Sequence, residues 1–488
     1  MLKARLIIFC FLITAVCAAQ ETNTFTSIIT EFYNSSKMEH AQWSLYAKYV
    51  DTNDEIINYN SKTALAPASG LKVFTSATAL DALGSEFKFE TKLFYDGIIT
   101  DDSTLDGNIY IVGGGDPTLG SDLTRGSLSL EKLINSWIAK IKNVGIKKIN
   151  GKVIADDLLF ESAPIPRLWF WEDMGNYYGA SVSALCLNDN LYHLYFKPNL
   201  KVGEKAELLR TEPVVENLTF DNLMKTGKKG SGDNGYVFCA PRQFNATLRG
   251  TIPAGVKEFS IKGAIPDPAL FAAQYLTKEL IRNNIEVTDY ASRQTTKIIY
   301  EENKLILTHQ SPPLKDIVYV INKKSFNLYT EMILRMASLV SSNNSKLNAG
   351  IDLIELFLTK NKINTDALNL FDACGLSRAN TITTKMMSDL LASMTIHKEF
   401  ESYYNSFAVA GDSDDFGGFK SFGKRTSIEK NARIKSGYIT GVRSHSGYVK
   451  DKSGRMIVFS FIANNFKGST AAINEAHKKL MIELANIE

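Results

Sequence analysis

The sequence predicts a mixed α/β fold in which one domain is interrupted by a large, β-rich insertion. Helical patterns cover residues 69–83 and most of 305–397, and the end of the chain has the pattern of a strand meander closed by a helix. Between these parts, residues 190–265 are rich in short strands and Gly/Lys turns. The 488 residues allow about three domains at ~150 residues each. With 44% hydrophobic and 22% charged residues, the composition excludes a disordered or fibrous chain.

Residues 1–19 have the pattern of a signal peptide. Lys3 and Arg5 precede an apolar run at 6–16, and small residues follow up to residue 19. An apolar run of this length is too short to cross a bilayer core of ~30 Å. We therefore expect cleavage at this point and export to the periplasm. An uncleaved anchor and a lipid attached at Cys17 remain alternatives.

The first helix is expected from Ser69 to Leu83, because apolar residues recur there every three or four positions and Gly84 ends the pattern. Strands are expected at 88–95, 108–112 and 152–155, a turn at 113–117, and helices at 130–144 and 266–284. Towards the C-terminus we expect strands at 432–439, 446–450 and 455–464, a hairpin turn at 451–454, and a helix at 470–487. His445, between two of these strands, is expected on the surface.

The charge balance and the cysteines exclude several classes of protein. Lys and Arg total 55 against 52 Asp and Glu, whereas a nucleic-acid binder needs clustered cations to neutralise phosphates. Cys186, Cys239 and Cys374 are far apart in the chain, without a CxxC pair or a Cys/His cluster. We therefore expect three buried thiols, no metal site and no disulfide scaffold.

Ser69-Gly70-Leu71-Lys72 is the candidate for nucleophilic chemistry. Residues three positions apart lie on one face of a helix, so the Lys72 amine can reach the Ser69 hydroxyl. A serine needs an adjacent base to act as a nucleophile, and a lysine whose pKa is lowered by burial can be that base. Other SxxK matches begin at residues 85, 421 and 427, but only Ser69 combines a preceding Pro-Ala with a following apolar helix.

Two further motifs follow along the chain. Ser325-Phe326-Asn327 precedes a helical run; its hydroxyl can relay a proton and its amide can bind a substrate backbone group. Lys435-Ser436-Gly437 lies on a predicted strand, where the cation and hydroxyl can bind a terminal carboxylate and the glycine lets substrate lie along the strand edge. Each triplet recurs elsewhere by chance. S-x-x-K, S-D-N and K-T-G in this order, however, are the joint signature of β-lactamases and penicillin-binding proteins.

On these motifs the chain resembles the class C low-molecular-mass penicillin-binding proteins, the type-4 D-alanyl-D-alanine carboxypeptidase/endopeptidases. The resemblance extends to residues 105–119, 177–185, 375–378, 447–449 and 455–466. The 252 residues between Lys72 and Ser325 match the large insertion that this family carries there. The chain departs from the family's usual residues at Phe326, Ser436, Tyr438 and Cys374, and none of these changes removes a reacting group.

The resemblance implies a serine transpeptidase/β-lactamase-like α/β domain, an antiparallel sheet flanked by helices, formed by residues 20–90 and 295–488. Residues 91–294 would form the insertion, with a separate module at 190–265. The implied activity is that of a serine D-Ala-D-Ala carboxypeptidase or DD-endopeptidase. Its substrates would be peptidoglycan stem peptides and its covalent inhibitors β-lactams, without a metal or organic cofactor. Peripheral contact with a membrane is left open.

The resemblance also implies a role for each motif residue. Lys72 would take the Ser69 proton, Ser69 would attack the D-Ala carbonyl, and Ser325 would pass the proton to the leaving amine. Backbone N–H groups of Ser69 and Tyr438 would form the oxyanion hole. The implied substrate-binding residues of these motifs are Asn327, Lys435, Ser436, Gly437 and Tyr438.

A pocket for a diaminopimelate side chain is implied at Asp173, Tyr178 and Arg378. Asp173 follows the aromatic run 169–171 and would face the ammonium of the zwitterionic side-chain end. Arg378 can bind its carboxylate with two parallel hydrogen bonds. The alternative is an exposed acidic loop and a structural arginine.

Two other functions fit the same motifs. A serine β-lactamase would share them, but the long insertion argues against a compact β-lactamase. A non-catalytic cell-wall-binding scaffold on the same fold is the second alternative. The intact Ser69, Lys72, Ser325 and Lys435 argue against that scaffold, because a protein without catalysis is free to lose them.

Overall fold

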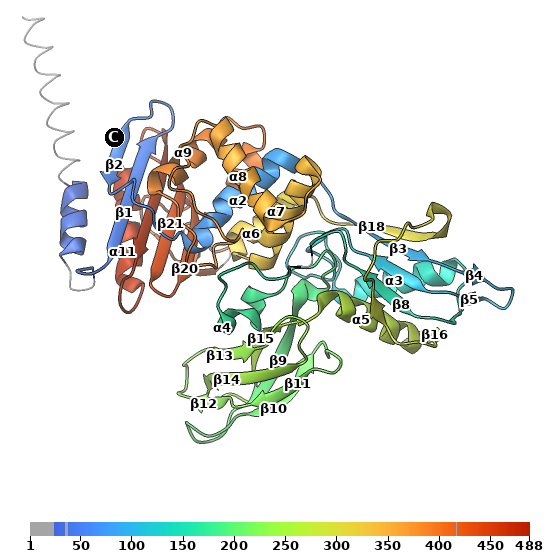
Figure 1. Cartoon of the computed structure of the whole chain (residues 1–488). Coiled ribbons are helices and arrows are strands. Elements are labelled where there is room, and N and C mark those ends of the chain that lie inside the picture. The colour runs from blue at the N-terminus through green and yellow to red at the C-terminus, as the bar shows by residue number, and fades with distance from the viewer. Residues whose placement is uncertain (1–23, 35–37, 162, 416) are drawn as a thin grey trace, which may run out of the picture.

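A computed structural model describes residues 24–34, 38–161, 163–415 and 417–488 (Figure 1). The expected signal peptide at residues 1–19 lies outside these ranges. No helix in the described part of the chain has the length and apolar character needed to cross a membrane.

Residues 24–33 are helical, and the further helices are α2 (Lys72–Leu83), α3 (Leu130–Asn143), α4 (Trp171–Met174), α5 (Pro268–Arg282), α6 (Leu314–Lys324), α7 (Asn327–Ser342), α8 (Leu347–Lys360), α9 (Thr384–Met394), α10 (Phe400–Asn405) and α11 (Ala471–Asn486). Short 3-10 helices are η1 (Ala68–Leu71), η2 (Tyr177–Gly179), η3 (Asn188–Asn190), η4 (Glu302–Lys304) and η5 (Gly417–Phe419). The strands of the chain's two ends are β1 (Gln42–Tyr49), β2 (Glu55–Tyr59), β19 (Ala408–Val409), β20 (Arg433–Ile439), β21 (Val442–Lys450) and β22 (Met456–Asn464). The strands between them are β3 (Glu90–Tyr95), β4 (Ile98–Ile99), β5 (Thr104–Asp106), β6 (Ile109–Val112), β7 (Lys148–Ile149), β8 (Val153–Asp156), β9 (Leu191–Lys197), β10 (Glu207–Glu212), β11 (Thr219–Asn222), β12 (Lys225–Gly227), β13 (Asn234–Phe238), β14 (Asn245–Pro253), β15 (Phe259–Ala264), β16 (Glu286–Val287), β17 (Ser292–Arg293) and β18 (Leu305–Gln310).

A six-stranded antiparallel sheet joins the two ends of the chain, in the order β19-β20-β21-β22-β1-β2. β1 pairs with β22 along its whole length, from Gln42 opposite Asn464 to Tyr49 opposite Ile457. The sequence analysis predicted the three C-terminal strands but missed β1 and β2. Every second residue of β1 from Trp43 onwards is a buried apolar residue of one core, so the alternation typical of a strand was present there.

Helices cover both faces of this sheet (Figure 1). On β22, Phe459 and Phe461 pack in one hydrophobic core with Leu480 and Leu484 of α11. The next residue, Ile462, packs in a second core, with the buried residues of α2, α6, α7, α8 and α9. Because side chains alternate between the faces of a strand, a strand covered on both sides is apolar throughout. The result is the predicted antiparallel sheet flanked by helices.

The inserted region forms two β-rich parts beside this domain (Figure 1). One part holds a five-stranded sheet, β17-β8-β6-β3-β18, and the four-stranded sheet β16-β7-β5-β4. The other holds β9 to β15 in a three-stranded and a four-stranded sheet, which agrees with the strand-rich pattern expected for residues 190–265. β3 at the start of the region proposed as the insertion pairs with β18, which follows the end of that region, so the chain enters and leaves it at adjacent strands.

The mainly helical stretch expected from residue 305 to 397 is confirmed by α6 to α9. Its first residues, Leu305–Gln310, differ and form strand β18. Only Ile306 of this strand is fully buried, as is usual for an edge strand with one solvated side. A strand with one buried residue carries too short an alternation to be recognised from the sequence.

Asp116 is a buried acid in the turn that follows β6. Its Oδ1 accepts hydrogen bonds from the backbone N–H and the hydroxyl of Thr118, at 2.8 and 2.7 Å. Its Oδ2 has no partner among the described residues. Burial raises the pKa of Asp116 to about 6, because an ionised carboxylate is poorly stabilised in this environment.

We expect Asp116 to make the protein less stable as the pH rises from about 4 to 6. The folded-state pKa lies above the unfolded value of 3.8, so the native state binds the proton more tightly and loses about 3 kcal/mol of stability over this range. Asp116→Asn removes this titration. The difference in free energy of unfolding between variant and parent, measured by urea denaturation, should therefore grow by that amount from pH 4 to 6 and then stay constant. If the free energies of unfolding of variant and parent instead changed in parallel from pH 4 to 6, Asp116 would not titrate in this range.

Candidate active site

Ser69 and Lys72 lie at the junction of η1 and α2. Lys72 is the first residue of α2, and its Nζ lies 3.1 Å from Ser69 Oγ. The predicted contact of the amine with the hydroxyl is present in the structure. Ser69 is partly exposed whereas Lys72 is fully buried, so the hydroxyl can meet a substrate and the amine is shielded from water.

Lys72 has two further hydrogen-bond acceptors. Its Nζ lies 2.6 Å from Asn327 Oδ1 and 2.7 Å from the carbonyl oxygen of Cys374. Together with Ser69 Oγ these acceptors use all three N–H bonds of an ammonium. Burial lowers the pKa of Lys72, and the charges of Asp372 and Glu331 oppose that effect. A lysine in this setting releases its proton more readily than one in water.

Ser325 and Lys435 form a second serine–lysine pair. Ser325 ends α6 with a left-handed backbone at φ 59°, a conformation that is uncommon outside glycine. Lys435 Nζ donates to Ser325 Oγ at 3.0 Å and to the carbonyl oxygen of Ser436 at 2.6 Å. Burial lowers the pKa of Lys435 well below its usual value, and the neighbouring cations Lys72 and Arg443 lower it further.

Asn327 links Lys72 to the segment that holds Tyr178. Besides accepting from Lys72, its side chain donates through Nδ2 to the carbonyl oxygen of Tyr178 at 2.8 Å. Both polar groups of the amide are thus engaged within the protein. Phe326, between Ser325 and Asn327, is buried and packs edge-on against Tyr329 at 4.8 Å between ring centroids.

Gly437 brings strand β20 into backbone contact with the start of η1. A Cβ at this position would lie 2.4 Å from the carbonyl oxygen of Pro67 and 2.8 Å from the amide nitrogen of Gly70. Ser444, opposite Gly437 on β21, donates to the same Pro67 oxygen at 2.6 Å. The sequence analysis expected this glycine to make room for substrate. In the structure it makes room for the turn that carries Ser69.

Two acids beneath Lys72 were missed by the sequence analysis. Glu331 Oε1 accepts from the backbone N–H groups of Ala373 and Cys374, at 2.8 and 3.0 Å. Asp372 accepts from those of Gly375 and Ser377, at 2.7 and 2.6 Å. These bonds hold the turn whose Cys374 carbonyl meets Lys72. Glu331 lies four residues after Asn327, one helical turn along the same face, which is the signal that could have revealed it.

Gly375 completes this turn. Its φ of +85° favours glycine, and a Cβ there would lie 1.8 Å from the carbonyl oxygen of Ala68. The turn therefore touches the backbone immediately before Ser69. The glycine of the Gly-Leu-Ser-Arg segment is required by this close approach.

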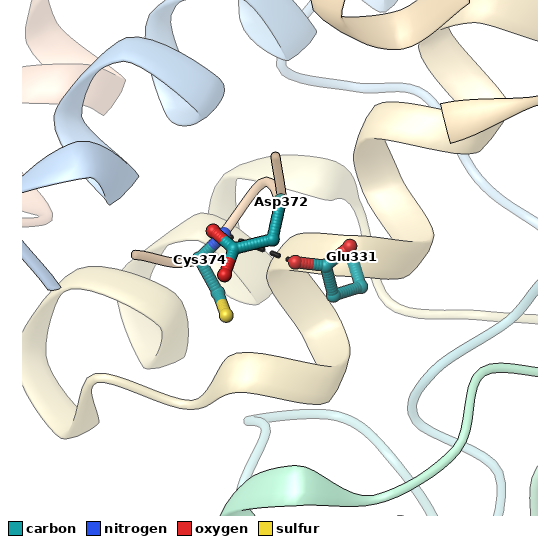
Figure 2. Close-up of side chains that lie close together, drawn as sticks. All are labelled: Glu331, Asp372 and Cys374. Carbon is teal, nitrogen blue, oxygen red and sulfur yellow. Dashed lines mark hydrogen bonds between the residues drawn. The ribbon is translucent and has the colours of Figure 1, made fainter. Parts of the chain in front are cut away.

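Glu331, Asp372 and Cys374 are also the group in the described structure whose side chains lie close enough to hold a metal ion, within 4.8 Å of one another (Figure 2). The acid oxygens, however, already accept hydrogen bonds from the backbone, from Arg335 and from Trp169. Burial raises the pKa of the Cys374 thiol well above its usual value, so it stays protonated. A metal would have to displace these bonds, and the cluster fits a support for Lys72 better than a metal centre.

The three residues expected to form the diaminopimelate pocket lie near one another. Burial raises the pKa of Asp173, and the charge of Arg378 and a hydrogen bond from Tyr178 oppose this rise. Arg378 donates to the carbonyl oxygen of Thr440 at 2.5 Å and lies over the ring of Phe170 at 5.2 Å. Thr440 is in the turn after β20, so this group borders the strand that carries the third motif.

The arrangement defines a class of protein. A serine hydroxyl next to a buried lysine of lowered pKa, with a second serine–lysine pair close enough to interact with that lysine, is the machinery of a serine hydrolase that uses lysine rather than histidine as its base. The cysteines Cys186, Cys239 and Cys374 are free and buried, as the sequence predicted.

Comparison with known proteins identifies the family. The D-Ala-D-Ala carboxypeptidase 3 (S13) family matches residues 26–486, and the chain belongs to that family. It is therefore a serine-type peptidase, a hydrolase, as the sequence analysis predicted.

Curated relatives and solved structures cover nearly the whole chain. The chain is 27% identical over 446 residues to a D-alanyl-D-alanine carboxypeptidase of Actinomadura sp., covering 89% of this chain and 80% of the relative. It is 26% identical over 448 residues to the D-alanyl-D-alanine carboxypeptidase DacB of Haemophilus influenzae, covering 91% of this chain and 89% of that relative. The crystal structure of penicillin binding protein 4 from H. influenzae aligns with a TM-score of 0.79 at 24% identity, over 94% of this chain and 99% of that one. A predatory peptidoglycan endopeptidase from Bdellovibrio bacteriovorus aligns with a TM-score of 0.51 at 15% identity, over 92% of this chain and 94% of that one.

We expect Glu331→Gln to shift the pH dependence of Ser69 acylation to lower pH. Lys72 acts as a base only when neutral, and the Glu331 carboxylate raises its pKa. Glutamine keeps the acceptor for the 373–374 backbone but removes the charge. The rising limb of the acylation rate, followed with a fluorescent penicillin from pH 5 to 10, should therefore move down by about one pH unit.

Glu355→Gln, an exposed residue of α8, is the matched control and should leave the profile in place. The Glu331 variant should also melt at a lower temperature, because it leaves Arg335 buried without its ion-pair partner. An unchanged limb in a folded variant would show that Glu331 does not influence the titration of Lys72.

Proposed function

We propose that this protein hydrolyses the D-Ala-D-Ala peptide bond of peptidoglycan stem peptides and the matching D-Ala cross-link, through a Ser69 acyl-enzyme. The observation that carries the proposal is the 3.1 Å contact between the buried Lys72 amine and the Ser69 hydroxyl. The family and the printed activities of the curated relatives point to the same bond.

In the first step neutral Lys72 removes the Ser69 proton. The neutral amine keeps two N–H bonds for Asn327 Oδ1 and the Cys374 carbonyl, which leaves its lone pair facing Ser69 Oγ. Ser69 Oγ then attacks the carbonyl carbon of the penultimate D-Ala. The hydrogen bonds of Lys72 thus orient the base without consuming the electron pair that it needs.

The tetrahedral intermediate carries its negative charge on the former carbonyl oxygen. Backbone N–H groups of Ser69 and Tyr438 receive it in this proposal, which is supported by the close contact of Gly437 of β20 with the 67–70 turn. One such donor is typically worth about 3–4 kcal/mol. Ser325, held by Lys435, relays the proton that Lys72 took from Ser69 to the leaving amine, so that Lys72 is neutral again; this amine belongs to D-alanine or to the side chain of the cross-linked residue. Water then hydrolyses the ester and regenerates Ser69.

Substrate binding completes the proposal. Lys435 and Ser436 bind the terminal carboxylate, and the backbone of Gly437 and Tyr438 binds the peptide along the edge of β20. Asn327 holds Lys72 and the Tyr178 backbone, and the direct hold on the peptide that the sequence analysis expected of it stays a prediction.

β-Lactams follow the same route but stop at the ester. The H. influenzae protein has been solved in complex with a β-lactam. We infer that a β-lactam acylates Ser69 here and is released slowly. We also propose that the protein works outside the cytoplasm after removal of residues 1–19, that residues 20–90 and 295–488 form the catalytic domain, and that residues 91–294 form the insertion.

Ser69→Ala tests the proposal. The parent should be labelled by a fluorescent penicillin and should turn nitrocefin over in a single burst that stalls, whereas the variant should show neither. Mass spectrometry of muropeptides should show loss of terminal D-Ala and cleavage of cross-links with the parent only, because the nucleophile is needed for both. An unlabelled parent would refute the enzyme, and steady nitrocefin turnover would identify a β-lactamase instead.

Asp173 and Arg378 are proposed to recognise the diaminopimelate side chain, with Tyr178 supporting Asp173. Asp173→Ala should lower kcat/KM roughly 10- to 100-fold on a stem peptide with diaminopimelate, because it removes a charge-assisted bond to the side-chain ammonium. Acylation by penicillin, which lacks that side chain, should stay nearly unchanged. Glu172→Ala, at the exposed neighbouring position in α4, is the control. Equal losses on both substrates would mean that Asp173 supports the fold and does not recognise the side chain.

A further inference from the structure

Arg443 lies on β21, one strand in from the proposed substrate edge. It pairs with Tyr438 of β20, and His445 pairs with Ser436. Directly paired residues of antiparallel strands point to the same face, so Arg443 shares a face with the hydroxyl of Ser436. β19 pairs with β20 only at residues 433 and 434, so beyond them the outer edge of β20 has no strand partner in the described structure.

The guanidinium of Arg443 has only neutral partners. Nε donates to Asn474 Oδ1 at 2.6 Å, Nη1 lies 3.4 Å from the Gly437 carbonyl oxygen, and Nη2 lies 3.0 Å from His445 Nε2. No Asp or Glu of the described residues forms an ion pair with it, and the first turn of α11, next to Asn474, holds no acid. A partly buried cation without a carboxylate is costly, and the positive end of a helix adds to that cost.

A chain of buried hydrogen-bonding groups also leaves the Nη2 end of Arg443 without an acceptor. Trp43 Nε1 lies 2.8 Å from His477 Nε2, and His477 Nδ1 lies 2.9 Å from His445 Nδ1. His445, expected on the surface, is in fact fully buried by α11. Burial lowers the pKa of His477 to about 3 and that of His445 well below its usual value, so both rings are neutral.

A neutral imidazole has one donor and one acceptor, whereas an indole and a guanidinium only donate. With a donor at each end and two neutral rings between, only two of the three contacts can be hydrogen bonds. If Trp43 donates to His477, and His477 to His445, then His445 Nε2 carries a proton that faces Arg443. The partly exposed guanidinium is the member of this chain that can turn elsewhere.

The charges near β20 and β21 indicate which kind of group the Arg443 guanidinium would bind. Lys435 holds its proton weakly, because burial and two nearby cations lower its pKa. Burial lowers the pKa of Arg443 only to about 10, so this side chain stays charged at neutral pH. We infer that Arg443 is a second ligand, with the Ser436 hydroxyl, for the free terminal carboxylate of the substrate. This inference rests on the proposed function and assigns its carboxylate specificity to a residue outside the three motifs.

The experiment compares acids with their uncharged counterparts. Arg443→Gln should raise KM roughly 10- to 100-fold for a peptide ending in D-Ala-D-Ala carboxylate, with a smaller effect on kcat, because a charge-assisted bond is lost on binding. The same variant should be acylated more slowly by benzylpenicillin but at the parental rate by benzylpenicillin methyl ester. Arg443→Lys, which keeps the charge, should restore part of the loss.

Arg455→Gln, which removes an arginine that already has Asp451 as a partner, should leave the ratio of acid to ester unchanged. Equal losses on acid and ester in Arg443→Gln, or no loss on either, would overturn the inference. If Arg443→Gln does not fold, the acid-to-ester ratio of Arg443→Lys decides, because a shorter reach to the carboxylate should still lower it. A parent that neither reacts with penicillin nor cleaves the peptide would refute the proposed function itself, which separates the two failures.

Discussion

The buried ammonium of Lys72 is the group around which the active site is built. Its three acceptors come from Ser69 in η1, Asn327 at the start of α7 and the Cys374 carbonyl. Each of these segments is therefore held at hydrogen-bonding distance from one atom. Burying an amine is costly unless its hydrogen bonds are all made. The same burial weakens its hold on the proton, so the constraint that fixes the geometry also produces the base.

This constraint explains how the inserted segment 169–178 is held in a fixed position relative to Ser69. The Tyr178 carbonyl is bound by Asn327, and the indole of Trp169 donates to Asp372 at 2.8 Å. Asn327 is bound directly by Lys72, and Asp372 holds the turn whose Cys374 carbonyl accepts from Lys72. A shift of the inserted segment 169–178 would thus disturb the base itself, and the proposed recognition by Asp173 is coupled to the chemistry through these contacts.

Much of this could be predicted from the sequence, because it depends on local spacing. The approach of Lys72 to Ser69 follows from the helical repeat, and the strands around Lys435 follow from alternation and a hairpin turn. Glu331, Asp372 and Arg443 could not be predicted in the same way, because their roles depend on contacts between segments far apart in the chain. Gly437 shows the limit clearly: its identity was read correctly, but the atom that requires it belongs to Pro67, 370 positions earlier. His445 was misplaced for the same reason, since α11 covers it.

The separation of acidic from basic side chains in the site indicates how an anionic substrate would be oriented there. The acids Glu331 and Asp372 lie beneath Lys72 and are bound to backbone N–H groups, so they support the base without facing the substrate. Towards β20 and β21 the basic groups are Lys435 and Arg443, and no acid among the described residues pairs with either. On the proposed function, an anionic chain end is attracted towards β20 and β21, while the proton acceptor Lys72 lies next to the two acids. A carboxylate placed there would give Arg443 the anionic partner that it lacks among the described residues.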